Sequence, residues 1–410
     1  MSAAVELQAA IERLRNDREF APQIVAWHTQ RSRGPISVPI PPELAPELTS
    51  MLLLRGIAGL YAHQAEAVRL TLAGRHTVVV TPTASGKTLC YQLPVLHAML
   101  QGAGTALLLY PTKALARDQQ QRIAEDLEAL GLDPRLVAAY DGDTSPGQRT
   151  VARDTARILI TNPDMLHTGI LPNHVRWRSL LGNLSYIVLD EMHSYRGVFG
   201  SQVAGVLWRL RRLCRFYGSA PRFVCTSATV ANPDQLAQAL AGEPVALVGA
   251  SGAPEPPRQV VLYNPPIIDQ RLGIRRPAGE DACMLAMLFL EQGLQTVCFA
   301  RSRMAVEQLV IALRRAAPAI GVDPQAIRGY RAGYLSTERR GIEAGLRDGS
   351  VRCVVATSAL ELGIDIGGLS ACVLVGYPGS TSSLWQRIGR VGRGPEGGLA
   401  VLVASSSPLD

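Results

Sequence analysis

The residues with the clearest potential for chemistry lie at positions 81–88, Thr-Pro-Thr-Ala-Ser-Gly-Lys-Thr. The stretch follows an apolar run at residues 77–80 and precedes a helix-like segment that begins at Leu89. This strand, turn and helix are the setting of a phosphate-binding loop, in which backbone N–H groups face the phosphates. Lys87 would reach the β- and γ-phosphates of ATP, and the Thr88 hydroxyl would bind Mg²⁺. A chance turn is the alternative, because Thr81 stands where the pattern has Gly.

The scarcity of lysine supports the phosphate-loop interpretation. Of 41 basic residues, 39 are Arg, and the only lysines are Lys87 and Lys113. The chain therefore uses Arg almost wherever a cation is sufficient. A compact ammonium on a thin stem suits a crowded phosphate site better than a planar guanidinium does, which explains why Lys is kept at this turn.

A second candidate site is the acidic pair Asp190-Glu191, which follows the apolar run at residues 186–189. Downstream of a phosphate loop, Asp190 would hold Mg²⁺, and Glu191 would orient and deprotonate the attacking water. A solvated pair that caps the next helix is the competing interpretation. The third candidate is the cluster Arg387, Arg390 and Arg393, of which the last two share one helical face. It predicts either cations that neutralise transition-state charge or a plain basic surface.

Composition limits the class of protein. A chain of 410 residues is too long to fold around a single hydrophobic core. Its net charge of +7 and its pI of about 9.2 favour a polyanionic partner. Seven cysteines occur singly, without a Cys-x-x-Cys pair, which argues against a zinc cluster and suits a reducing compartment. The sequence shows neither a signal peptide nor an apolar stretch long enough to span a membrane. We therefore expect a cytoplasmic protein without a membrane partner.

The order of elements predicts an α/β fold with two tandem domains. Short runs of Val, Ile and Leu alternate with helical segments, which is typical of parallel sheets covered by helices on both faces. Polar residues follow these runs, where open α/β sheets bind their ligands. We predict an N-terminal helical and extended extension (1–44), a first domain (45–248), a linker (249–259) and a second domain (260–410).

Taken together, these motifs resemble a superfamily 2 DExH-type helicase core of two RecA-like domains, over roughly residues 45–405. A phosphate loop without its first Gly is ordinary in that superfamily. The segments that carry the resemblance are 61–64, 83–88, 110–115, 161–164, 190–193, 227–229, 356–357, 363–365 and 386–393. Segments 139–144, 330–335, 360–365 and 377–379 narrow it to the MrfA/YprA-type bacterial DNA repair helicases.

The resemblance implies a role for each matching residue. Gln64 would read the adenine edge and Asp365 would contact the ribose, while Arg390 and Arg393 would complete the ATPase site opposite Lys87 and Glu191. The remaining nucleotide-binding residues would be Tyr61, Thr83, Ala84, Ser85, Gly86, Thr88 and Gly363. Residues that couple nucleotide state to closure would be His193, Ser227, Thr229 and Gln386. Nucleic-acid contacts would come from Thr112, Lys113, Asn162, Arg301, Ser302 and Thr357, for which helix N-caps and solvated loops are competing interpretations.

The function implied is an ATP- and Mg²⁺-dependent DNA helicase or translocase that moves toward the 5′ end of its strand, in DNA repair. Its partner would be single-stranded or tailed duplex DNA, bound mainly through phosphates, and we expect a monomer. An RNA helicase, a core with stimulated ATPase activity but little unwinding, and a catalytically silent clamp are the alternatives. MrfA/YprA-type proteins continue into a region with a four-cysteine zinc site, which this sequence lacks.

Overall fold

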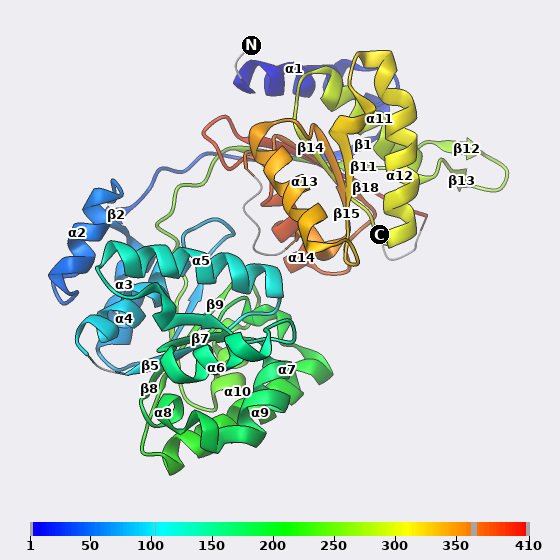
Figure 1. Cartoon of the computed structure of the whole chain (residues 1–410). Coiled ribbons are helices and arrows are strands. Elements are labelled where there is room, and N and C mark those ends of the chain that lie inside the picture. The colour runs from blue at the N-terminus through cyan, green and yellow to red at the C-terminus, as the bar shows by residue number, and fades with distance from the viewer. Residues whose placement is uncertain (1–2, 103, 362–366, 407–410) are drawn as a thin grey trace. The chain divides into compact units, whose positions relative to one another are not determined.

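The computed structural model describes residues 3–102, 104–361 and 367–406. The chain divides into two compact units, one formed by residues 35–253 and the other by residues 3–34 together with residues 254–406. Each unit is an α/β domain built on a seven-stranded sheet (Figure 1). The units are described separately below.

The sheet of the first unit is entirely parallel, in the order β10-β4-β9-β8-β5-β7-β6. Its strands are β4 (Thr77–Val80), β5 (Thr105–Leu109), β6 (Val137–Ala139), β7 (Ile158–Thr161), β8 (Leu184–Leu189), β9 (Arg222–Ser227) and β10 (Ala246–Val248). Alternate side chains enter two cores, one containing Leu107 and Ile187 and the other Leu108 and Val188. Burial on both faces explains why these strands read as continuous apolar runs.

Helices cover both faces of this sheet (Figure 1). They are α2 (Pro46–Leu54), α3 (Ala62–Leu72), α4 (Thr88–Leu100), α5 (Lys113–Ala129), α6 (Pro146–Thr155), α7 (Pro163–Met165), α8 (Arg178–Gly182), α9 (Gly197–Phe216) and α10 (Pro233–Ala241). A short pair, β2 (Ser37–Val38) and β3 (Leu60–Tyr61), precedes α3. Because α4 and α5 follow β4 and β5 directly, their first turns lie at the carboxyl edge of the sheet.

The second unit has the strand order β1-β11-β18-β17-β14-β16-β15. Its strands are β1 (Ile24–Gln30), β11 (Arg258–Tyr263), β14 (Thr296–Phe299), β15 (Ile327–Tyr330), β16 (Cys353–Ala356), β17 (Ala371–Val375) and β18 (Gly398–Val403), with a separate hairpin of β12 (Ile267–Asp269) and β13 (Ile274–Arg275). Its helices are α1 (Ala3–Asn16), α11 (Ala278–Glu291), α12 (Arg303–Ala316), α13 (Ser336–Asp348) and α14 (Thr381–Ile388). Within the seven-stranded sheet, β1 pairs with β11 in antiparallel fashion and the other strand pairs are parallel, while the hairpin of β12 and β13 is antiparallel.

The N-terminal segment differs from the separate extension that the sequence predicted. Helix α1 inserts Leu7 and Leu14 into the core that also holds α11, and β1 pairs along β11. The Trp27 indole N–H donates to Gln259 Oε1 at 2.6 Å, and the Arg15 guanidinium lies 4.4 Å from the Trp27 ring centre. The sequence predicted helical and extended structure over residues 1–44, but it carried no information about the sheet on which this segment packs. The predicted linker also ends earlier than expected, since β11 begins at Arg258.

No helix among the described residues is long and apolar enough to cross a membrane. The cysteines are all unpaired by disulfides, and six of them are buried. No group of three or more potential metal ligands occurs in the described part of the chain.

Candidate nucleotide and nucleic-acid sites

The phosphate loop has the left-handed backbone that such a turn requires. Ala84 has φ +61° and Gly86 has φ +77°, and a Cβ on Gly86 would lie 2.5 Å from Gln64 Nε2. Lys87 Nζ donates to the carbonyl oxygens of Thr81 and Pro82, at 2.9 and 2.8 Å, so its ammonium is held over the loop. Helix α4 begins at Thr88, which places the hydroxyl at the helix N-terminus beside the position of phosphates.

Gln64 is tied to this loop by both ends of its amide. Its Oε1 accepts from the Tyr61 backbone N–H at 2.9 Å, and its Nε2 donates to the Gly86 carbonyl at 2.9 Å. The helix that carries Gln64 is therefore fixed to the phosphate loop. Recognition of adenine by Gln64 stays a prediction, and it requires these two bonds to be exchanged for bonds to the base.

The acidic pair lies at the carboxyl end of β8, one strand position from β9 and two from β4. Asp190 is buried and accepts a hydrogen bond from the Thr226 hydroxyl on β9. Glu191 has φ +50°, an uncommon conformation for a residue with a side chain. Its Oε2 is buried, makes no hydrogen bond within the described structure and lies 3.4 Å from His193 Nδ1. A strained backbone and an unsatisfied carboxylate oxygen are typical of a site that awaits a ligand.

Burial raises the pKa of Asp190 to about 7, and the charge of Glu191 acts in the same direction, against the Thr226 hydrogen bond and the positive charge of Lys87. A cation between the two carboxylates and Lys87 would favour the ionised form. The oxygen donors of Thr88 and Asp190 therefore fit Mg²⁺, a hard ion that prefers such ligands.

The raised pKa predicts a pH-dependent effect of Asp190→Asn in the absence of metal. Because the folded pKa exceeds the unfolded one, the wild type loses stability as pH rises through about 7, whereas the variant does not. From about pH 6 to about pH 8, the free energy of unfolding of the variant should rise relative to that of the wild type by about 1.4 kcal/mol. This difference corresponds to about 3–6 °C in melting temperature. Thermal unfolding with a chelator at the two pH values measures this. A difference between the proteins that does not change with pH would contradict it.

The predicted coupling residues are only partly brought together. Ser227 Oγ lies 3.3 Å from His193 Nδ1 and donates to the Ala228 carbonyl at 2.7 Å. Ser227 thus joins β9 to the segment that follows the acidic pair. Thr229 is exposed and has no contact of this kind in the described structure. Its coupling role, like those of the other three, stays a prediction.

Most predicted nucleic-acid residues are helix N-caps at the carboxyl ends of strands. The side-chain oxygens of Thr112, Asn162, Ser302 and Thr357 accept from the backbone N–H groups of Leu115, Met165, Ala305 and Ala359. The competing interpretation as caps therefore holds for these four side chains. A cap still leaves the first-turn N–H groups facing outward, where they suit phosphate oxygens.

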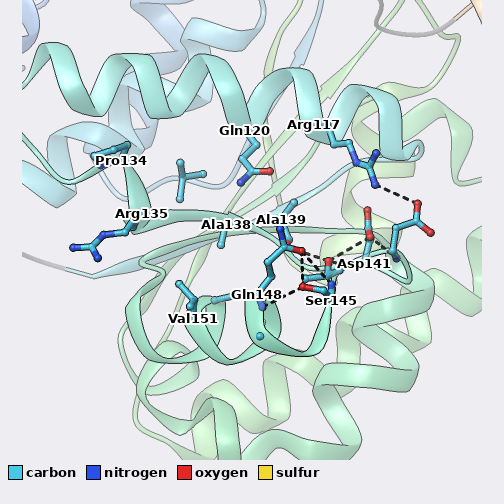
Figure 2. Close-up of a pocket in the computed structure, with 15 residues that line it drawn as sticks. Arg117, Gln120, Pro134, Arg135, Ala138, Ala139, Asp141, Ser145, Gln148 and Val151 are labelled. Atoms are coloured by element: carbon cyan, nitrogen blue, oxygen red, sulfur yellow. Dashed lines mark hydrogen bonds and ion pairs between the residues drawn. The ribbon is translucent and has the colours of Figure 1, made fainter. Parts of the chain in front are cut away.

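The two predicted cations differ in their surroundings. Lys113 Nζ pairs with Asp143 Oδ1 at 2.8 Å, and Arg117 also contacts this carboxylate. Asp143 belongs to a tight turn after β6, beside a cavity of about 780 Å³ between α5 and α6 (Figure 2). In the second unit, Arg301 is exposed and donates to the Tyr377 carbonyl at 3.1 Å.

The arginine cluster of the second unit is more deeply buried than a surface patch. Arg387 Nε donates to Glu361 Oε2 at 2.9 Å, and Arg390 donates to the Glu361 carbonyl. Gln386 and Arg390 are buried, while Arg393 is half-buried. The predicted nucleotide-binding residues Gly363 and Asp365, the latter expected to contact the ribose, lie outside the described residues. A role for Arg390 and Arg393 in ATP hydrolysis stays a prediction.

Sequence reasoning missed four residues that support the site. Thr226 holds Asp190, and Glu361 joins Arg387 and Arg390. The hydroxyls of Tyr91 and Tyr110 lie 3.1 Å apart, and burial, followed by the charge of Asp190, raises the pKa of both tyrosines. Thr226 directly precedes segment 227–229, which is one of the segments that carry the family resemblance. Its position at the end of a strand could therefore have indicated a role in the site. The other partners depend on packing that no sequence pattern marks.

A phosphate loop after β4, an acidic pair after β8 two strand positions away, and a second sheet of the same type define the tandem RecA-like class. The DEAD/DEAH box helicase family matches residues 61–236, and the helicase conserved C-terminal domain matches residues 280–395. The chain therefore has a superfamily 2 helicase core, and it belongs with the MrfA/YprA type.

Relatives of this type are similar over nearly the whole chain. The ATP-dependent helicase YprA of Bacillus subtilis is 48% identical, over 98% of this chain and 53% of its own length. The ATP-dependent helicase HRQ1 of Saccharomyces cerevisiae is 36% identical, over 100% of this chain and 38% of its own. The crystal structure of the DUF1998 helicase MrfA bound to DNA superimposes with a TM-score of 0.90 at 48% identity, covering 98% of this chain and 53% of that one. The chain thus spans about half the length of YprA and of MrfA.

Proposed function

We propose that the chain hydrolyses ATP and uses the energy to move along single-stranded DNA toward its 5′ end, as the core of a DNA repair helicase. The observation that carries the proposal is the arrangement of Lys87, Asp190 and Glu191 on one sheet edge, with Asp190 buried and Glu191 Oε2 buried without a hydrogen-bond partner in the described structure. The DNA-bound structure of MrfA, which is similar over 98% of this chain, supports DNA as the nucleic acid.

The chemistry follows from these side chains. Loop N–H groups and Lys87 bind the phosphates, which requires Nζ to leave the carbonyls of Thr81 and Pro82. Glu191 accepts the proton of the attacking water, and His193, 3.4 Å away, positions the carboxylate. Thr88 and Asp190 would hold Mg²⁺, which supplies charge neutralisation on the phosphates when bound. Arg390 and Arg393 would add positive charge to the transition state.

Movement requires that nucleotide state change the grip on DNA. The candidate DNA contacts follow β5 and β7 in the first unit, and β14 and β16 in the second. Two such surfaces that alternate between closed and open states with each ATP would advance along a strand. Contacts to phosphates make the binding salt-dependent and weakly sequence-specific. We further propose that the protein acts as a monomer in the cytoplasm.

The test compares ATPase stimulation by single-stranded DNA and RNA, followed by strand displacement on 3′-tailed, 5′-tailed and forked duplexes. We expect stimulation by DNA and displacement of the 3′-tailed substrate. Equal stimulation by RNA would overturn the DNA assignment, and displacement of only the 5′-tailed duplex would overturn the direction. If DNA stimulates ATPase activity but no duplex is displaced, the chain would be an ATPase or translocase core, and strand separation would require additional protein.

A further inference from the structure

The positive charge of the chain is concentrated in one segment of the first unit. Residues 165–233 contain eight Arg and only two acids, Asp190 and Glu191, a net charge of +6 against +7 for all 410 residues. The stretch from residue 192 to residue 233 contains no acid. Most of this stretch lies outside the sites described above, so its charge is not explained by ATP binding or by the predicted DNA contacts.

Helix α9 carries the centre of this charge. Its buried side consists of Val203, Val206, Leu207, Leu210 and Cys214. The opposite side exposes Trp208 (63%) and Phe216 (75%), together with Arg209, Arg212 and Arg215. At 100° per residue, these five side chains fall within about one third of the helix circumference. The helix runs on the outside of the unit, next to α8 and α10 (Figure 1).

A small recess continues this surface at the end of α9. It is a cavity of about 240 Å³ lined in part by Arg211, Arg215, Arg222 and Glu243. Arg211 and Arg215 contact Glu243, and Arg222 is exposed without an ion pair in the described structure. One carboxylate therefore faces three guanidinium groups, which leaves an excess of positive charge in a recess large enough for a phosphate group.

The recess and the predicted DNA contacts lie on opposite edges of the same sheet. Arg222 is the first residue of β9, so the recess is at the amino ends of the strands. Thr112 and Asn162 follow the carboxyl ends of β5 and β7. Cations near a helix C-terminus also stabilise the helix dipole, which accounts for Arg215. That effect explains neither the exposed aromatic rings nor Arg222.

We propose that the α9 surface, formed by Trp208, Arg212, Arg215, Phe216 and Arg222, is a second binding site for a single nucleic-acid strand. Exposed aromatic rings between cations are the arrangement that stacks unpaired bases while guanidinium groups hold the phosphates. A duplex offers no base faces to these rings, so the site favours single strands. This inference rests on the proposed function, because it adds a contact for the same strand beyond the helicase track.

The test is the triple variant Trp208→Ala, Arg212→Gln and Arg215→Gln, measured by fluorescence anisotropy with a long fluorescein-labelled oligo(dT) strand. We expect the dissociation constant to rise about tenfold and the salt slope, d log K/d log[salt], to become about 1.4 less negative, as for two lost phosphate contacts. A short oligo(dT) that fills only the track should bind both proteins equally. A variant that keeps Trp208→Ala but carries Arg212→Lys and Arg215→Lys in place of the Gln substitutions should recover the salt slope.

Helix α12 offers a matched control, because it exposes Met304, Ile311 and Arg315 on one side. The variant Ile311→Ala with Arg315→Gln should bind the long strand as the wild type does. The proposal is overturned if the triple variant binds the long oligo(dT) strand as tightly as the wild type does. It is also overturned if the triple variant loses binding to polyglutamate while it keeps binding to oligo(dT), because that result would indicate an acidic protein partner. If the wild type binds no oligo(dT) of either length, the proposed function fails as well, and the two failures are thereby distinguished.

Discussion

Replacing Glu191 with Gln is expected to lower ATP turnover by about 10²–10⁴-fold while ATP binding is largely retained. The amide keeps the size of the side chain but cannot accept a proton from water. Glu191 is suited to that task because its Oε2 is buried, has no hydrogen-bond partner in the described structure and has His193 Nδ1 3.4 Å away. Steady-state phosphate release measures turnover, and equilibrium binding of a fluorescent ATP analogue measures affinity.

The control for this substitution is Glu66→Gln, an exposed glutamate on α3. Both measurements should match the wild type in that variant. If Glu191→Gln left turnover unchanged, Glu191 would not be the general base. If it abolished nucleotide binding instead, the left-handed backbone at this position would depend on the charge, and Glu191 would have a structural role.

The sequence predicted the strand, turn and helix around the candidate phosphate loop because these signals are local. Residues 81–87 lie between β4 and α4, and Thr88 begins α4, as the pattern predicted. The pair Asp190-Glu191 follows β8 for the same reason. Alternating apolar runs also indicated two parallel sheets, since strands buried on both faces have no polar positions. Each of these inferences depends only on neighbours in sequence.

Features that depend on distant partners were not predicted from the sequence. The pairing of β1 with β11 joins residues more than 200 positions apart, so α1 and β1 read as an extension. The buried position of Arg390 is likewise decided by packing. The caps formed by Thr112 and Asn162 are local contacts, which the sequence left open as an alternative. A polar residue at a strand end can serve a helix, a ligand or both, and its sequence pattern is the same in each case.

The most consequential of these unpredicted contacts is the pair Arg387–Glu361, and we expect Arg387→Ala to destabilise the second unit by about 3–5 kcal/mol. Both side chains are nearly buried, at 9% and 12% exposure. The Arg387 guanidinium also lies 5.3 Å from the Phe299 ring centre, which adds a cation–π contact. Removing the arginine leaves the Glu361 carboxylate in the interior without its partner, at a large desolvation cost.

Hydrogen exchange in α14 and β17, together with urea unfolding, measures this loss within the intact chain. The double variant Arg387→Met with Glu361→Leu should recover most of the stability, because apolar pairs of similar volume often replace buried ion pairs without loss. Arg13→Ala is the control, since Arg13 is half exposed and its ion pairs with Asp17 at 3.9 Å and Glu291 at 3.7 Å lie at the surface. Equal stability of Arg387→Ala and the wild type would mean that water reaches Glu361. The pair would then be available to respond to nucleotide, instead of fixing α14 to the segment that ends at Glu361.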